Sequence, residues 1–149
     1  MRKIYLDTNF LLDVLIKDRP GSDEAMLVLS LLKRFHIEIV CSTQSLLDIY
    51  FIAGRKKIIK EEIDVLCAWL VDYANVRPIG WFELRDALMS AEKDIEDAAQ
   101  IALAKTEHCE IFLTSDQEVL KKEEDGSLLF MSPAGFIEKL SNVQSSPLS

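Results

Sequence analysis

Short apolar runs alternate along the chain with longer segments in which apolar residues recur every three or four positions. The short runs are typical of buried β-strands and cover residues 3–6, 37–41, 76–79, 110–114 and 128–131. The helical segments cover residues 10–16, 22–32, 43–54, 59–70, 82–90, 94–106 and 133–140. Strands separated by helices predict βαβ crossovers. We therefore expect an α/β fold with a mostly parallel sheet and helices on both faces.

Turn and capping residues indicate where some of these elements begin. Pro20-Gly21 predicts a turn. Ser22, directly after it, is a candidate N-cap for the second helix, and either Ser42 or Thr43 is a candidate cap for the third.

Length and composition fit one soluble domain. The chain has 149 residues, of which 49% are hydrophobic, enough for a continuous core. We expect a single domain over residues 1–140 and a polar C-terminal tail over 141–149. No apolar run approaches the roughly 20 residues of a membrane span, and Asp7 precedes any signal-peptide apolar region. We therefore expect a cytoplasmic protein that does not bind a membrane.

The cysteines and histidines do not indicate a disulfide framework or a zinc site. There are three cysteines, and none belongs to a CxxC pair. The two histidines, His36 and His108, are isolated at the ends of predicted helices. We expect all five residues to be structural.

Four aspartates carry the main indication of function. Asp7 and Asp116 lie just past predicted strands, whereas Asp48 and Asp97 lie near the starts of helices that can reach the same edge. A carboxylate cluster in an apolar chain is unfavourable without a cation, and magnesium and manganese prefer oxygen ligands. Metal-assisted phosphodiester hydrolysis uses such a cluster and needs no nucleophilic side chain. Without metal the acids should repel one another, and at least one should have a raised pKa.

Each acid also has an ordinary structural explanation. Asp7 and Asp116 could be cap or turn residues, and Asp48 could lie on a solvated helix face. Asp94 and Asp97 are three residues apart on one helix face, where acids in a first turn favour the helix dipole. One such acid would be weak evidence, but four at compatible places in the topology indicate a site.

The formal net charge of −8 is unusual for a protein that binds phosphates. Bound divalent cations would neutralise the cluster locally. An acidic balance also suits a basic partner, although solubility alone can explain it. The best basic cluster is Arg55-Lys56-Lys57. It is a candidate nucleic-acid-binding segment if its helix end faces the site, and otherwise a solvated linker.

Four segments, in order, resemble the motifs of PIN domains, and the resemblance covers about Ile4 to Ile137. Ile4-Tyr5-Leu6-Asp7-Thr8-Asn9 resembles the opening motif. The second motif is resembled by Ser42-Thr43-Gln44-Ser45-Leu46-Leu47-Asp48-Ile49-Tyr50-Phe51. The third is resembled by Asp94-Ile95-Glu96-Asp97-Ala98, and the fourth by Phe112-Leu113-Thr114-Ser115-Asp116.

The resemblance implies a three-layer α/β/α fold and a ribonuclease that depends on Mg²⁺ or Mn²⁺. It implies that four acids are catalytic, namely Asp7, Asp48, Asp97 and Asp116, and that three of them, Asp7, Asp97 and Asp116, bind metal. The supporting polar residues it implies are Asn9, Thr114 and Asp94. The second acid is often Glu in this family and is Asp48 here, so its shorter side chain could reach the metal through a water.

Many small bacterial PIN proteins are toxins of toxin–antitoxin pairs, so the resemblance implies an RNA substrate and an antitoxin partner. The first two helices are also rich in apolar residues, including Phe10, Leu11, Leu15, Met26 and Leu31. A partner helix laid in a groove could cover this excess, and so could the sheet together with a homodimer contact.

Three rival functions remain to be compared. A haloacid-dehalogenase-like phosphatase needs a second acid two residues after the first, and that position is Asn9 here. A receiver-like signalling domain needs an acidic pair near the end of its first strand. A degenerate PIN-like module would bind RNA or protein without catalysis, and the presence of all four acids argues against it.

Overall fold

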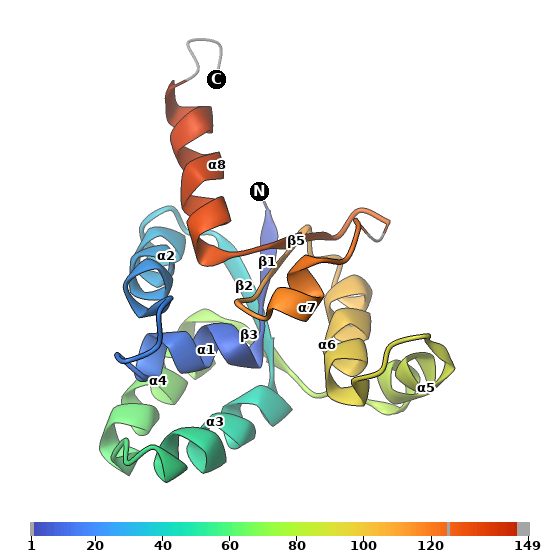
Figure 1. The fold of residues 1–149 in the computed structure, drawn as a ribbon, viewed down its shortest axis with the longest axis horizontal. Helices are drawn as coiled ribbons and strands as arrows, with labels where there is room; N and C mark the ends of the chain where they lie inside the picture. Colours follow the sequence, from blue (N-terminus) through green and yellow to red (C-terminus); the bar gives the residue numbers. More distant parts are fainter. Residues whose placement is uncertain (1, 125, 146–149) are drawn as a thin grey trace.

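Five parallel strands form the centre of the molecule. The computed structural model describes residues 2–124 and 126–145. Its strands are β1 (Lys3–Leu6), β2 (Glu38–Ser42), β3 (Asn75–Arg77), β4 (Ile111–Leu113) and β5 (Leu129–Met131). They pair in the order β3-β2-β1-β4-β5, and each of these pairs is parallel. The predicted sheet is therefore present, and it is parallel in every described pair (Figure 1).

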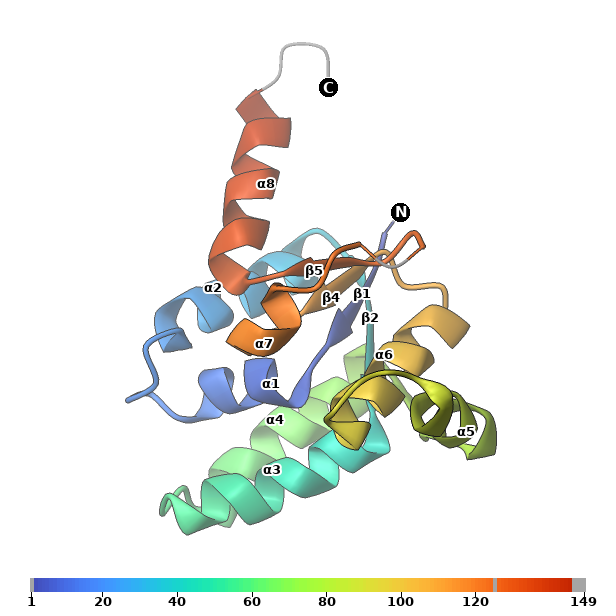
Figure 2. The same cartoon turned by 45° about the vertical axis from the view of Figure 1, so that its right-hand side comes forward.

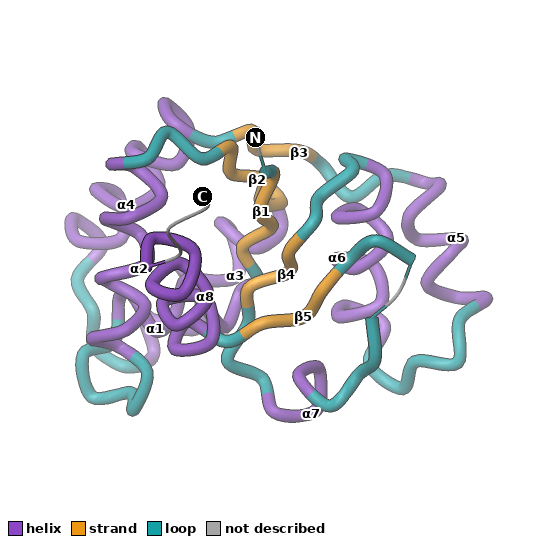
Figure 3. The backbone as a smooth tube through the Cα atoms, turned by 90° about the horizontal axis from the view of Figure 1, so that it is seen from above, coloured by secondary structure: helices purple, strands orange, loops and turns teal. Residues whose placement is uncertain are grey.

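Helices cover both faces of the sheet, which confirms the three-layer α/β/α fold (Figure 1; Figure 3). They are α1 (Thr8–Leu15), α2 (Ser22–Arg34), α3 (Thr43–Arg55), α4 (Lys60–Tyr73), α5 (Trp81–Met89), α6 (Ile95–Thr106), α7 (Gln117–Leu120) and α8 (Pro133–Ser145). On one face α1 packs against α2 and α3, and α2 packs against α8. On the other face α5 packs against α6, while α7 contacts β5. None of the described helices is long and apolar enough to cross a membrane.

Alternating side chains of β1 divide the core into two parts. Ile4 and Leu6 belong to the larger cluster, which the helices α1 to α4 complete. Tyr5 points to the opposite face and stacks on Phe112 of β4, with ring centroids 5.0 Å apart. This alternation is the consequence of the period of two in a strand, and burial on both faces explains why these strands read as continuous apolar runs.

The strand order places a switch point beside β1. The chain passes from β1 to β2 and β3 on one side of the sheet, and then returns to β4 and β5 on the other. Ligand sites in such sheets form at the carboxyl ends of the strands near this switch. Helices α1, α3 and α6 all begin at this edge (Figure 2), so the polar residues of their first turns gather there.

Both histidines have a structural role in ending helices. His36 follows α2 and His108 follows α6, with φ angles of 52° and 59° in the left-handed region. The next residue donates its backbone N–H to a carbonyl five residues back: Ile37 to Leu32 and Cys109 to Ala104, at 3.0 and 2.9 Å. This is the Schellman arrangement, and it explains why each histidine lies between a helix and a strand. The three cysteines are buried and free, as expected.

Three local predictions are wrong or incomplete. Ser22 is the first residue of α2 rather than its N-cap, because the first helical hydrogen bond runs from the Ala25 N–H to the carbonyl of Gly21, at 3.0 Å. The last helix continues five residues beyond Leu140, since no glycine or proline lies between Leu140 and Pro147 in the sequence. The predicted tail is therefore helical up to Ser145, and its remainder, 146–149, lies outside the described residues. The short helix α7 was not predicted.

Candidate active site

Asp7 is the first residue after β1 and the most deeply buried acid of the site, with 1% of its surface exposed. Its place follows from the register, in which Leu6 lies beside Leu113 of β4. The backbone N–H of Asp7 donates to the Leu113 carbonyl at 3.1 Å. This brings the carboxylate next to Thr114, whose hydroxyl donates to Asp7 Oδ2 at 2.5 Å.

Burial raises the pKa of Asp7 from 3.8 to about 6. The hydroxyl of Thr114 and the backbone amides of Thr8 and Asn9 favour the charged form, but they offset the effect of burial only in part. The charge of Asp116 raises the pKa further. The site therefore holds a carboxylate whose negative charge is incompletely compensated by its surroundings.

Thr114 also fixes the position of Asp116. The backbone N–H of Asp116 donates to Thr114 Oγ1 at 3.0 Å, so one buried hydroxyl joins the two acids. Asp116 caps α7, because its Oδ1 accepts from the N–H of Glu118 at 2.9 Å. The capping explanation for Asp116 is thus correct, and it leaves Oδ2 beside the site.

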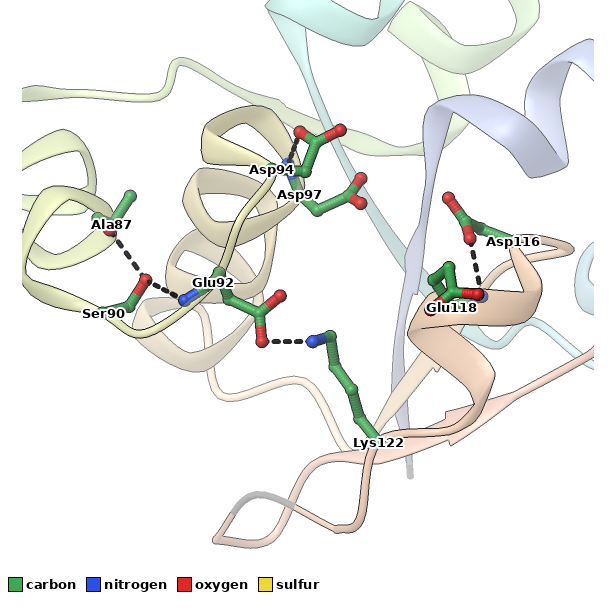
Figure 4. Close-up of polar contacts among 8 residues, drawn as sticks. All are labelled: Ala87, Ser90, Glu92, Asp94, Asp97, Asp116, Glu118 and Lys122. Atoms are coloured by element: carbon green, nitrogen blue, oxygen red, sulfur yellow. Dashed lines mark hydrogen bonds and ion pairs between the residues drawn. The ribbon is translucent and has the colours of Figure 1, made fainter.

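The third acid, Asp97, comes from the first turn of α6. Asp94 is the N-cap of this helix, and its Oδ1 accepts from the N–H groups of Glu96 and Asp97 at 3.0 and 3.1 Å. The pKa of Asp97 is raised to about 7, first by burial and then by the charges of Asp94, Asp7, Asp116 and Glu92. Asp97 and Asp116 point into the same space between α6 and α7 (Figure 4). The prediction that at least one clustered acid has a raised pKa is confirmed.

Asp48 occupies a different place from the other three. It lies halfway along α3 and is half-buried. Its carboxylate lies against that of Glu96, and this contact, followed by burial and by the charges of nearby acids, raises the pKa of Glu96 to about 7. Asp48 therefore borders the site through Glu96, which neighbours Asp97 in the sequence. Glu96 was not singled out from the sequence, although it lies inside the third acidic motif.

A buried network of hydroxyl and amide groups lies directly beneath the acids. Gln100, one turn after Asp97 on α6, accepts from the hydroxyls of Tyr5 and Ser45 at 3.2 and 3.1 Å. Its amide nitrogen donates to Thr8 Oγ1 at 3.2 Å, and Thr8 Oγ1 lies 2.7 Å from Ser45 Oγ. The network joins β1, α1, α3 and α6, the elements whose ends form the site. Its residues were missed because each looks like an isolated polar residue in the sequence.

A second contact holds the loop before α6. Glu92 forms an ion pair with Lys122, which follows α7 (Figure 4). The backbone N–H of Glu92 also donates to Ser90 Oγ at 3.3 Å, and the Ser90 hydroxyl donates to the Ala87 carbonyl at 2.7 Å. These contacts link the end of α5 to the segment after α7, on the side of the site where Asp97 lies (Figure 4).

Two groups of predicted residues do not direct their side chains to the acids, although the backbone amide of Asn9 contacts Asp7. Asn9 Oδ1 accepts from Arg19 Nη2 at 3.4 Å, so its amide is engaged with the loop between α1 and α2. Arg55, Lys56 and Lys57 are exposed around the far end of α3. Arg55 follows Asp48 by seven residues, about 10 Å along the helix. Since α3 begins at the site, its basic end points away from the acids, and RNA contact by these residues stays a prediction.

The carboxylates suit a hard divalent cation in chemistry, but they do not form a tight cage. In the part of the chain that the structure describes, no three His, Cys, Asp or Glu side chains stand close enough to hold one metal ion. Mg²⁺ usually keeps several waters and takes only one or two carboxylates directly. The raised pKa values of Asp7 and Asp97 also show negative charge that a cation would stabilise. An ion bound partly through water fits this site.

Comparison with known proteins identifies the family. The protein-family model described as PIN domain matches residues 3–118 of the chain. The chain belongs to the PIN domain family. The match spans the four acidic motifs and the strands β1 to β4, and it ends just inside α7.

Individual PIN proteins resemble the chain over most of its length. Ribonuclease VapC1 of Aquifex aeolicus (strain VF5) is 25% identical over 137 residues, which covers 82% of this chain and 92% of that protein. The structure of Mycobacterium tuberculosis VapC20, a Sarcin-Ricin loop cleaving toxin, superposes with a TM-score of 0.63 at 14% identity, covering 77% of this chain and 91% of that one. The structure of VapBC2 from Rickettsia felis, bound to a DNA fragment from its promoter, superposes with a TM-score of 0.60 at 16% identity. The match covers 87% of this chain and 98% of that one. The two structures share this fold.

Proposed function

We propose that this PIN domain is a metal-dependent endoribonuclease of the cytoplasm. The observation that supports the proposal is that Asp97 feels the charges of both Asp7 and Asp116 near the switch point of the sheet. Burial and mutual repulsion raise the pKa of the first two to about 6 and about 7. Such an arrangement is costly to the fold and is expected where the acids serve a cation and a substrate.

In this proposal each residue of the site has a definite task. Asp7, Asp97 and Asp116 hold Mg²⁺ or Mn²⁺, and Asp48 acts beside them through Glu96. A divalent ion supplies an activated water and stabilises the leaving oxygen of a phosphodiester. Thr114 donates to one oxygen of Asp7 and thereby fixes the direction of the other. Asp94 orders the first turn of α6.

RNA is proposed as the substrate because of the relatives. The Aquifex protein is named a ribonuclease, and the Mycobacterium protein is described as cleaving the sarcin–ricin loop. Both cover more than three quarters of this chain. The opposite possibility, a PIN-like module that binds RNA or protein without catalysis, would bind RNA and leave it intact.

The proposal is tested by incubating purified protein with RNA in manganese, in magnesium and in EDTA. We expect cleavage with either metal and none in EDTA. Asp97→Asn should lower the rate more than about 100-fold, since loss of groups that merely support a metal ligand already costs about 10–100-fold. Asp72→Asn, an exposed aspartate at the end of α4, is the matched control and should cleave normally. Equal cleavage by both variants would assign the activity to another site or to a contaminant.

A protein partner, as in a toxin–antitoxin pair, is the second part of the proposal. Among the five apolar residues predicted to be in excess, Phe10, Leu11 and Leu15 are buried in the core, so the prediction is wrong for these three. Met26 is 50% exposed. Together with Val14, Val65 and Trp69 it lines a groove of about 360 Å³ between α1, α2 and α4.

An amphipathic helix of an antitoxin fits this groove, and a second copy of the chain is the alternative occupant. Expression of the chain alone should arrest growth of its host, and expression of Asp7→Asn should not. Normal growth with the wild-type protein in the absence of any antitoxin would refute the toxin role while leaving the nuclease proposal intact.

A further inference from the structure

The exposed face of α3 carries a line of side chains that leads away from the acids. Asp48, Phe51 and Arg55 are spaced three and four residues apart, so they lie above one another on one face of the helix. Asp48 borders the acidic site through Glu96, and Phe51 and Arg55 follow about 4.5 and about 10 Å further along the helix. An RNA strand whose scissile phosphate lies at the acids can therefore continue along this face.

Phe51 presents an aromatic ring to the solvent, since 67% of the residue is exposed. The guanidinium of Arg55 lies over this ring, with Cζ 5.6 Å from the ring centroid, so an aromatic face and a cation stand together. Unpaired RNA bases stack on aromatic rings and on guanidinium planes of this kind. The bases of a duplex already stack on one another and offer no free face. The pair of Phe51 and Arg55 therefore favours a single strand.

Three consecutive exposed basic residues, Arg55, Lys56 and Lys57, lie where this line ends. Within residues 2–124 and 126–145, no ion pair joins any of the three to an acid. Other surface lysines, such as Lys60 and Lys122, are paired with acids. The chain has a formal net charge of −8, so an unpaired run of positive charge is a place where phosphates are attracted rather than repelled.

We propose that the exposed face of α3 is the path of a single-stranded RNA substrate, with one base stacked on Phe51 and the phosphates held by residues 55–57. This inference rests on the proposed ribonuclease function. The path tolerates any sequence, because every base has a flat face that can stack. Contact with a second copy of the chain is the alternative occupant, because Leu47, one turn before Phe51, is also 70% exposed.

Binding of a fluorescein-labelled single-stranded RNA to the full chain in EDTA tests the stacking contact without cleavage. Phe51→Leu keeps an apolar side chain but removes the ring, so the Kd should rise about tenfold. Phe51→Trp restores a ring and should bind at least as tightly as the wild-type protein. Phe82→Leu removes an exposed ring from α5 and is the matched control, which should bind normally. The same RNA annealed to its complement should not distinguish the four proteins.

The salt dependence of the same binding tests the basic end of the path. The double variant Lys56→Gln/Lys57→Gln loses two phosphate contacts, so the slope of log affinity against log salt should become shallower by about 1.4. Lys33→Gln/Arg34→Gln removes two exposed charges at the end of α2 and is the matched control, which should keep the wild-type slope. An equal change of slope in both double variants would reduce the effect to net charge and overturn the assignment of these phosphates.

The cleavage assay then separates this inference from the proposed function. With manganese, kcat/KM of Phe51→Leu should fall about tenfold, whereas that of Phe82→Leu should stay at the wild-type value. Equal RNA binding by Phe51→Leu and the wild-type protein would overturn the path. If Phe51→Leu instead lost self-association in sedimentation, with RNA binding unchanged, the face would be a contact between two copies. RNA that binds as expected but stays intact with either metal would contradict the nuclease proposal and leave the path in place.

Discussion

Replacing Asp7 by asparagine is expected to stabilise the metal-free protein at neutral pH. Burial raises the pKa of this carboxyl from 3.8 to about 6, and because only 1% of the residue is exposed, solvent screens the effect very little. A shift of about two pKa units corresponds to roughly 3 kcal/mol. Asparagine cannot carry the charge, but its NH₂ group replaces one acceptor oxygen, which costs about 1 kcal/mol. The expected gain is about 2 kcal/mol, or roughly 4–8 °C in Tm.

The pH dependence follows from the direction of the shift. Because the folded-state pKa of Asp7 lies above the unfolded-state pKa, the unfolded chain releases this proton first as the pH rises. The resulting loss of stability is absent below a pH of 3.8, grows between 3.8 and about 6, and is complete above that range. The advantage of the Asp7→Asn variant should therefore appear over the same interval.

Thermal unfolding followed by circular dichroism measures this effect in EDTA, at about pH 4 and about pH 7.5. Asp72→Asn is the control and should melt like the wild-type protein at both values. Added manganese should raise the Tm of the wild-type protein by mass action and have little effect on Asp7→Asn. If Asp7→Asn melts at or below the wild-type temperature at neutral pH without metal, the account of Asp7 as a strained carboxylate is refuted.

Three further substitutions test the supporting structure. Gln100→Leu should lower the free energy of unfolding by roughly 2–3 kcal/mol in urea titrations, because it removes the buried acceptor of the Tyr5 and Ser45 hydroxyls and the donor to Thr8. His108→Gly should raise the free energy of unfolding by roughly 0.5–1 kcal/mol, because glycine adopts the left-handed φ of this position without strain. Thr114→Val removes the hydrogen bond that lowers the pKa of Asp7, so the acidic limb of the pH–rate profile should move to higher pH, and an unchanged profile would contradict this role for Thr114.

The parts of the fold that were predicted are those with a strong local signal. The strands β1, β2 and β4 are short apolar runs. Asp7 follows β1 directly, and Asp116 lies three residues after the end of β4. Because the carboxyl ends of parallel strands meet at one edge, the sequence was sufficient to bring these acids together with Asp97 in the prediction. The helices were located within a few residues, and their ends were missed where backbone turns rather than side chains set the boundary, as at Ser22.

The features that were not predicted depend on contacts between distant segments. Gln100 lies in an Ala-rich helix, and its partners Tyr5 and Thr8 are more than 90 positions away in the sequence. The ion pair between Glu92 and Lys122 joins two loops that have no common periodicity. Likewise, the burial of Phe10 and Leu11 follows from the packing of α1 against α2, α3 and α4, which an apolar pattern cannot specify.

The buried network and the acids above it have opposite effects on the fold, and this explains how the site persists. Asp97 is repelled by Asp7, Asp116 and two acids of its own segment, so the first turn of α6 would move away from the sheet if nothing held it. Gln100, one turn further along the same helix, is joined through buried hydrogen bonds to β1, α1 and α3. The repulsion is therefore confined to the carboxylates and does not displace the helix. A bound cation would remove this repulsion without requiring the scaffold to move, as expected of a preorganised site.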